Sequence, residues 1–365
     1  MTWTGIRTIM VLELRQRVRA TRWRVMLGIW VAVLILLCGG LAIAVETASP
    51  ENATNEYLLP LYDVVVCFVL GIGLIVAPTL SATSINGDRA DATLALLQAT
   101  ALRSQEIVVG KLLAAWIAAI AFLGVAVPFL VILTVAGGSH WQALVAHLVI
   151  LVFTLGAVCA IGLGFSSLTA RPSASAVLTY IVVAALTVGT PLATAIASSV
   201  VTGTQTEVTY HVDYDKSTDD KIVCQSEPEI ETHEVTRTDR IWWILTPNPF
   251  VALGDATAHA PLQPASAVFG APDSFLSLTG QGVDLMRNPQ PSRVVYNRCE
   301  DRDDSYDGPS SSSTSSDDHG PVAKHLAFWP ASLVALMALG AGGVITASRR
   351  LRVPAGRLPR GVRLA

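Results

Sequence analysis

Long apolar runs separated by polar stretches dominate the chain. Six of them reach the roughly 20 residues that an α-helix needs to cross a bilayer. We therefore predict six membrane-spanning helices, with two longer polar stretches at 86–111 and 202–325 and a tight Gly-Gly-Ser-His turn after the third. The runs cover residues 25–45, 64–85, 112–138, 141–169, 172–201 and 326–348.

The polar stretch between the second and third runs has an ordered pattern of its own. Leu94, Leu97 and Ala101 recur at helical spacing, and charged residues fill positions around them. An apolar stripe with solvated charges beside it is typical of a short amphipathic helix. We predict such a helix at about 87–104.

Composition agrees with a membrane protein. The 365 residues are 52% hydrophobic and only 15% charged, with a mean hydropathy of +0.51. Soluble globular domains carry about 25% charged residues. The sequence therefore predicts an all-α polytopic membrane protein, in which residues 25–201 hold the first five spanning helices and 326–348 the sixth.

Basic residues are placed asymmetrically about the predicted spans. Six arginines precede the first span, three basic residues lie between the second and third, and six arginines follow the last span in the tail at 349–365. The opposite short loop carries Glu46, Glu51 and Glu56 and no basic residue. Because arginine and lysine mark the cytoplasmic side, both termini and the helix at about 87–104 are predicted to be cytoplasmic.

The leader at 1–24 mixes apolar and basic positions. Trp3, Ile6, Ile9 and Met10 share one face of a helix, which predicts an amphipathic helix lying at the membrane surface. Two alternatives stay open, a disordered basic tail that only sets topology and a cleaved signal peptide. The first apolar run is about twice as long as a signal-peptide core, which argues against cleavage.

Residues 202–325 form the one sizeable water-facing part, which is external by this topology. Alternating apolar and polar residues at 208–224 predict a strand or hairpin. Residues 241–256 are aromatic and apolar and contain two prolines, which suits a short helix-turn element at the outer interface. The acidic, serine-rich stretch at 299–320 is predicted to be a flexible linker.

Cysteine placement follows the same topology. Cys38, Cys67 and Cys159 lie inside predicted spans, where a free thiol behaves as a small apolar group. Cys224 and Cys299 are the two cysteines of the external segment. We predict a disulfide between them, because such bonds form in oxidising compartments and stabilise a segment by about 2 to 4 kcal/mol.

The remaining motifs do not support a catalytic or metal site. The stretch that starts at Asp303 resembles a calcium loop, but Thr314 stands where a glutamate is required. The histidines of the external segment lack the paired spacing of a zinc site. Gly110 and Lys111 lack the upstream glycine of a phosphate loop, and no hydrolase or metalloprotease motif occurs. We expect no catalytic residue and no metal site in this chain.

His147 lies within the fourth predicted span. Ionisable groups inside a membrane are functional candidates. Because His147 is close to the outer end of its span, we favour a hydrogen-bonded or snorkelling side chain over a functional one.

The stretch from Leu80 to Lys111 resembles the signature of type-two, or type V, ABC exporter permeases. The resemblance is carried by pairs and triplets such as Gly87-Asp88-Arg89, Thr93-Leu94, Leu96-Leu97, Glu106-Ile107 and Gly110-Lys111. Members of that family run as a basic connecting helix, six spans, a coupling helix between the second and third, and an external element before the last. The chain resembles this order over nearly its whole length, and residues 246–253 resemble the family's re-entrant or interfacial element. The insertion at 202–325 is larger than the family minimum.

The resemblance implies partners rather than chemistry in this chain. An ABC ATPase subunit would bind the ATP and magnesium and dock on the coupling and connecting helices, and a second permease subunit would complete the path. It implies no cofactor in this chain, no nucleic-acid partner, contact with membrane lipid, and a bacterial cytoplasmic membrane. Carried over residue by residue, the docking site would be lined or supported by Asp88, Arg89, Thr93, Leu94 and Leu97, with Glu106 and Lys111 anchoring its far end.

Two functions from different classes follow. The favoured one is the membrane subunit of an ATP-driven exporter that moves an amphiphilic compound, such as a drug, a lipid-linked molecule or a peptide. The alternative is a non-transporting membrane anchor or sensor whose external segment binds a ligand. Stimulated ATP hydrolysis by a partner and directional flux would distinguish them.

Overall fold

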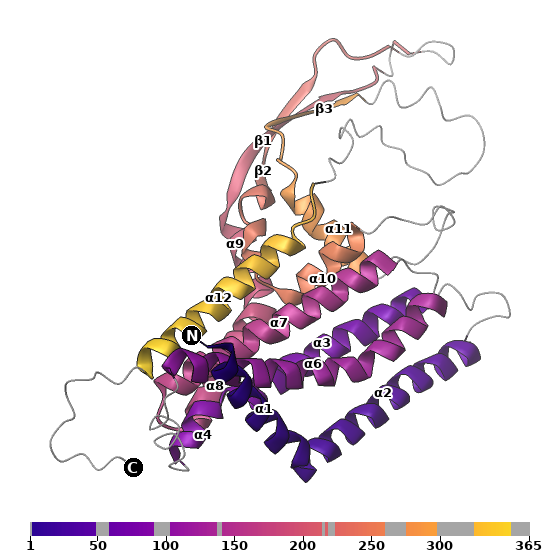
Figure 1. Cartoon of the computed structure of the whole chain (residues 1–365). Helices are drawn as coiled ribbons and strands as arrows, with labels where there is room; N and C mark the ends of the chain where they lie inside the picture. Colours follow the sequence, from indigo (N-terminus) through magenta and orange to yellow (C-terminus); the bar gives the residue numbers. More distant parts are fainter. Residues whose placement is uncertain are drawn as a thin grey trace. The chain divides into compact units, whose positions relative to one another are not determined.

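The computed structural model describes most of the chain (Figure 1). Three residues of the predicted docking segment, Thr93, Leu94 and Leu97, lie outside its described residues, as does Cys299 of the predicted disulfide. The described ranges are 2–48, 58–90, 103–136, 141–213, 216–217, 223–259, 275–297 and 325–351.

Helices form the membrane part of the molecule. Within the described ranges, six helical segments are long and apolar enough to cross a membrane, so the predicted all-α polytopic class is confirmed. The leader forms a helix rather than a disordered tail. The helices are α1 (Trp3–Arg19), α2 (Thr21–Ala48), α3 (Leu58–Ser81), α4 (Ser84–Ala90), α6 (Ser104–Ala136), α7 (Trp141–Leu168), α8 (Pro172–Ala184), α9 (Thr190–Val200) and α12 (Trp329–Arg350), with a π-helical turn η1 (Ala185–Gly189) between α8 and α9.

The chain divides into two compact units. The first comprises Met1–Thr190, Thr246–Gln281 and Ala327–Ala365, and the second comprises Pro191–Leu245 and Gly282–Leu326. The short helix α10 (Pro249–Ala258) and the start of α11 (Phe275–Arg287) therefore group with the spanning helices. The helix predicted within 241–256 is present, and seven of its ten residues are buried.

The core of the first unit is built by α3, α6 and α7, which pack side by side (Figure 1). Valine, leucine and alanine side chains fill it. Helix α2 is attached through Trp30, whose Nε1 donates to the carbonyl oxygen of Phe122 at 3.1 Å and whose ring stacks on that of Phe122 at 4.4 Å. The opposite face of α2 exposes Ile29, Ile35 and Leu36, so nothing in the described part of the chain covers it.

Helices α7 and α12 approach closely through glycine. A Cβ added to Gly343 would lie 2.4 Å from the carbonyl oxygen of Ala160, and one added to Gly164 would lie 2.7 Å from the Cα of Gly343. Small residues let the backbones of two membrane helices come together without an intervening side chain. This contact fixes the last span against the fourth, although the two are far apart in the sequence.

The second unit contains a three-stranded sheet. Strand β1 (Thr202–Tyr210) pairs antiparallel with β2 (Glu229–Thr236) and parallel with β3 (Arg293–Asn297), in the order β2-β1-β3. The hairpin predicted at 208–224 is placed wrongly along the chain: β2 lies after that range, and within it an isolated antiparallel bridge pairs Val212 with Cys224. Strand β1 overlaps the predicted range only at 208–210 and begins before it. Its first half is rich in threonine, a β-branched residue that favours strands without being apolar. Two 3-10 turns, η2 (Thr238–Arg240) and η3 (Trp242–Leu245), follow β2.

Neighbouring glycines in α12 test the contact between α7 and α12. Gly343→Ala should lower the free energy of unfolding by about 1 to 3 kcal/mol, because the added methyl overlaps the backbone of α7. Gly342 has no atom near its added Cβ, so Gly342→Ala should be neutral or stabilising by up to about 1 kcal/mol. Thermal unfolding of the purified chain in detergent measures both. Equal midpoints would contradict the packing described here.

Candidate functional site

Four of the seven residues predicted for the docking segment lie in the described part of the chain. Asp88 and Arg89 are on α4, and Glu106 and Lys111 are in the first two turns of α6. Arg89 is exposed, whereas Glu106 and Lys111 are buried. Arg89 is therefore accessible to a partner, whereas Glu106 and Lys111 make contacts inside the fold.

Glu106 joins the start of α6 to the start of α1. Its Oε2 accepts a hydrogen bond from the backbone N–H of Arg103 at 3.1 Å, which satisfies one of the free N–H groups at the beginning of α6. Its Oε1 accepts from the hydroxyl of Thr2 at 3.0 Å and from the Thr2 backbone N–H. A carboxylate at two helix N-termini is also favoured by both helix dipoles.

Lys111 is the buried centre of a group of four charges whose other members are partly exposed. We name this group the Lys111 cluster: Glu13, Arg17, Asp88 and Lys111. Only 1% of the Lys111 side chain is exposed, and its Nζ lies 2.6 Å from Asp88 Oδ2 and in direct contact with Glu13 Oε1. Arg17 Nη2 lies 4.0 Å from Glu13 Oε2 and donates to the carbonyl oxygen of Leu80 at 2.9 Å. Two cations therefore face two carboxylates, and α1, α4, α6 and the end of α3 are tied together.

Burial changes the pKa of Arg17. It lowers the pKa of the guanidinium, and the nearby Glu13 carboxylate offsets part of that decrease. An arginine keeps its charge under such a shift because its ordinary pKa is far above neutrality. Arg17 therefore stays charged at physiological pH despite its burial.

Gly110 explains how α1 comes close enough for Glu13 to contact Lys111. A Cβ on Gly110 would lie 2.7 Å from the Cβ of Ile9 and 3.1 Å from the carbonyl oxygen of Ile6. Both isoleucines are buried against α6. The Gly110-Lys111 pair, which does not form a phosphate loop, thus combines a close helix contact with the buried charge beside it.

Helix α4 is fixed on its other side by hydroxyl and amide groups. Ser166 Oγ accepts from the backbone N–H groups of Ile85 and Asn86 at 3.0 and 3.2 Å. The Asn86 amide donates to Ser175 Oγ at 2.9 Å and to Thr169 Oγ1 at 3.1 Å. These bonds join α4 to the end of α7 and the start of α8. The sequence gave no signal for them, because each pair is separated by about 80 residues or more.

The arrangement favours motion as one body over chemistry. Displacement of α4 would be passed through Asp88 to α1 and α6, and through Asn86 to α7 and α8. Among the described residues, no group of three or more His, Cys, Asp or Glu side chains is placed to hold a metal ion. Through the contacts of Asp88 and Asn86, α1, α4, α6, α7 and α8 meet at one place, which we name the mechanical junction.

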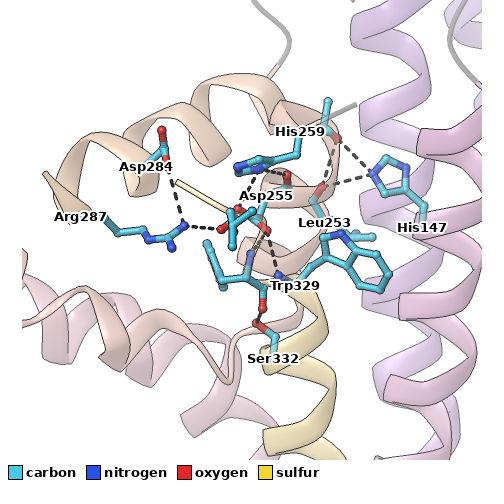
Figure 2. Close-up of polar contacts among 11 residues, drawn as sticks. His147, Leu253, Asp255, His259, Asp284, Arg287, Trp329 and Ser332 are labelled. Atoms are coloured by element: carbon cyan, nitrogen blue, oxygen red, sulfur yellow. Dashed lines mark hydrogen bonds and ion pairs between the residues drawn. The ribbon is translucent and has the colours of Figure 1, made fainter. Parts of the chain in front are cut away.

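A second polar network surrounds α10, and sequence reasoning missed most of it. His147 is fully buried, and its Nε2 lies 3.2 Å from the carbonyl oxygen of Leu253 and 3.1 Å from Thr257 Oγ1, as Figure 2 shows for Leu253. Because a carbonyl oxygen only accepts, Nε2 carries the hydrogen, and Nδ1 accepts from the hydroxyl of Tyr62 at 2.8 Å. A neutral ring satisfies every contact, so the hydrogen-bonded interpretation of His147 is confirmed.

Asp255 of α10 holds the start of the last span (Figure 2). Its Oδ2 accepts from the backbone N–H groups of Phe328 and Trp329 at 2.7 and 2.8 Å. Its Oδ1 lies 3.2 Å from Nδ1 of His259. A carboxylate at a helix N-terminus satisfies free N–H groups and is favoured by the helix dipole.

Asn248 links α10 to the fifth span. Its Oδ1 accepts from the Phe250 backbone N–H at 2.9 Å, and Pro249 occupies the first turn of α10. Its Nδ2 donates to the carbonyl oxygen of Thr187 at 2.9 Å. In a regular helix that carbonyl would bond to the N–H of Pro191, which proline lacks. The Asn-Pro dipeptide was the local signal for this cap, whereas the partner of Asp255 had none.

Asp63 of α3 performs a similar role for α11. Its Oδ2 accepts from the backbone N–H of Leu276 at 2.8 Å, and the side chain is buried. The spans that contain Asp63, His147 and the start of α12 are therefore all joined to the α10 and α11 region by buried polar contacts.

Comparison with known proteins gives one family match. The sequence model of the family described as "ABC-2 family transporter protein" matches residues 7–219. That range contains the Lys111 cluster and the first five spans. A search of the curated proteins found no match to the chain.

A comparison of a buried lysine with an exposed lysine tests the Lys111 cluster. Lys111→Met leaves Glu13 and Asp88 without their shared cation, so the free energy of unfolding should fall by about 3 to 5 kcal/mol. Lys216 also contacts a carboxylate, Asp213, at 2.7 Å, but 73% of its side chain is exposed. Lys216→Met should leave the unfolding midpoint unchanged, because water replaces the lost partner. Thermal unfolding in detergent measures both, and a stable Lys111→Met variant would show that the cluster does not hold the helices together.

Proposed function

This chain belongs to the ABC-2 family of transporter proteins, and on that premise we propose that it is the permease subunit of an ATP-driven exporter. It is a multi-pass membrane subunit, and the ATPase of such a system is a separate protein. In the proposed function, ATP hydrolysis by that partner moves an amphiphilic compound outward through the membrane.

The observation that carries the proposal is the Lys111 cluster beside α4. Asp88 lies on α4, at the start of the predicted docking segment, and Lys111 lies on α6, at its end. The contact between these two side chains joins the two helices. Glu13 adds α1, the predicted connecting helix. A partner that pushes on the segment between Ala90 and Ser104 would therefore move both flanking spans together, which is what coupling to an ATPase requires.

Charge supports a cytoplasmic position for this junction. Exposed arginines at the same end of the unit include Arg89, Arg103 and Arg171, and basic residues concentrate on the cytoplasmic side. We propose that both termini are cytoplasmic and that the chain lies in a bacterial cytoplasmic membrane. The sheet of the second unit would then face outward.

An apolar groove supports an amphiphilic passenger. It has a volume of about 560 Å³ and runs along α3, with Phe275 of α11 at one end. Its walls are almost wholly apolar, and Asp63 is the one charged residue among them. The lining residues are Asp63, Val64, Cys67, Phe68, Gly71, Ile72, Ile75 and Phe275.

Outward-facing apolar side chains support a second permease subunit. Helix α2 exposes Ile35 and Leu36, and α8 exposes Val177 and Ile181. These two spans are the least covered of the six in the described part of the chain. We propose that an identical or related permease packs against them, which would place a path between the two subunits.

A membrane anchor or sensor is the competing function. It would use the sheet of the second unit to bind an external ligand, and it would require neither ATP hydrolysis nor directional flux. Reconstitution of the chain with its ATPase separates the two, because a sensor would stimulate no net movement of any compound.

Docking is tested by co-purification with the ABC ATPase encoded beside this chain. Arg89→Asp combined with Leu94→Asp should abolish retention of the ATPase, since both changes place negative charge on the proposed docking segment. Arg240→Asp combined with Leu285→Asp alters one exposed arginine and one exposed leucine of the second unit, and it should retain the ATPase. If both double variants retain it, the docking surface lies elsewhere.

The proposed disulfide between Cys224 and Cys299 is tested by counting thiols. Three of the five cysteines, Cys38, Cys67 and Cys159, are free. Alkylation of the denatured, unreduced chain should therefore modify these three, and alkylation after reduction should modify all five. Mass spectrometry reads the difference, and five modified cysteines without reduction would exclude the bond.

A further inference from the structure

Charges of opposite sign are separated at the end of the first unit that carries the Lys111 cluster. The acidic residues of α1, α4 and α6 are Glu13, Asp88 and Glu106. All three are engaged inside the fold, with Lys111, Thr2 or the start of α6. The arginines of the same elements behave differently, because most of them are exposed.

Helix α1 shows this separation in one element. Its inner face buries Ile6 and Ile9 against α6. Its outer face exposes three arginines together with three apolar side chains, of which Trp3 is 67% exposed. The exposed arginines are Arg7, Arg15 and Arg19, and the exposed apolar residues are Trp3, Leu12 and Val18.

The chain path places this face at the membrane boundary. Helix α1 ends at Arg19, Ala20 is extended, and α2 begins at Thr21. The first membrane-spanning window starts at Trp23. One extended residue covers only about 3.5 Å, so the end of α1 at Arg19 lies close to the boundary where the first span enters the bilayer. Figure 1 shows the sharp bend between α1 and α2.

We infer that the outer face of α1 binds the headgroups of anionic phospholipids. The arginines complement phosphate and carry no competing carboxylate, because Glu13 is held by Lys111. Trp3, Leu12 and Val18 insert among the headgroups, as apolar side chains of interfacial helices do. The α1 arginine face thus selects anionic over zwitterionic lipid, and it does so independently of any ATPase.

The consequence is a link between lipid and the mechanical junction. Helix α1 is joined to α6 through Glu13 and Lys111, and to the start of α6 through Thr2 and Glu106. Anionic lipid that holds α1 to the surface therefore holds one side of the Lys111 cluster. This regulation rests on the proposed function, whereas the lipid preference itself does not.

The test measures lipid selectivity of the full chain without an ATPase. The chain is reconstituted in phosphatidylcholine vesicles that contain spin-labelled phosphatidylglycerol or spin-labelled phosphatidylcholine, and the immobilised fraction of each label is compared. Basic residues at a membrane surface attract anionic headgroups. Arg7→Gln combined with Arg15→Gln should therefore reduce the preference for phosphatidylglycerol several-fold, and added salt should weaken the preference of the unchanged protein.

A matched variant controls for net charge. Arg240→Gln combined with Arg293→Gln removes two exposed arginines from the second unit, and the preference should persist. Equal loss in both variants, or no loss in either, overturns the inference. If the α1 variant keeps its lipid preference but no longer retains the ATPase, the face is a protein surface and the inference is wrong, while the proposed function stands.

Discussion

A charge that leaves water must be neutralised by a partner, and at Lys111 this requirement determines how one end of the molecule is built. The ammonium group is buried on the first turns of a spanning helix, where solvent cannot reach it. Its two carboxylate partners come from α1 and α4, one before and one after the first two spans. Lys111 keeps one partner if either carboxylate withdraws, but the loss of both would leave a buried charge unpaired, which costs several kcal/mol. The helices α1, α4 and α6, which are separate in the sequence, are therefore held together at Lys111.

The opposite end of the first unit meets a related requirement with helix termini. The first N–H groups of a helix lack partners within that helix, and a membrane supplies few. Asp63 and Asp255 provide them for α11 and α12, and Asn248 provides one for α10. Asp63 and Asp255 cap helices that lie far from them in the sequence, whereas Asn248 caps the helix that directly follows it. Spans that would otherwise only touch through apolar surface are thus positioned by directional bonds.

Much of this architecture could be predicted because hydropathy depends on local sequence. The spans follow from the length of apolar runs, whereas alternation of apolar and polar residues located the strands of the second unit only roughly, since β2 lies after the predicted range. The contacts of Glu13, Asn86 and Asp255 could not be predicted, because their partners lie far along the chain and no local pattern marks them. Asp88 and Lys111 were named through a family resemblance, but their direct contact is visible only in three dimensions. Asn248 lies between these cases: Asn-Pro signals a cap, while its bond to Thr187 depends on the fold.

That last bond has an evolutionary consequence. The carbonyl of Thr187 is available to Asn248 because residue 191 is a proline, which cannot donate to it, and the π-helical turn η1 occupies the same place in the span. In a descendant that lost the proline, the N–H of residue 191 would compete with Asn248 for that carbonyl, while Asn248 would keep its bonds to Thr190 Oγ1 at 2.9 Å and to the start of α10. Selection therefore acts on the two positions jointly, and they should vary together among relatives of this chain even though neither side chain carries a charge or takes part in chemistry.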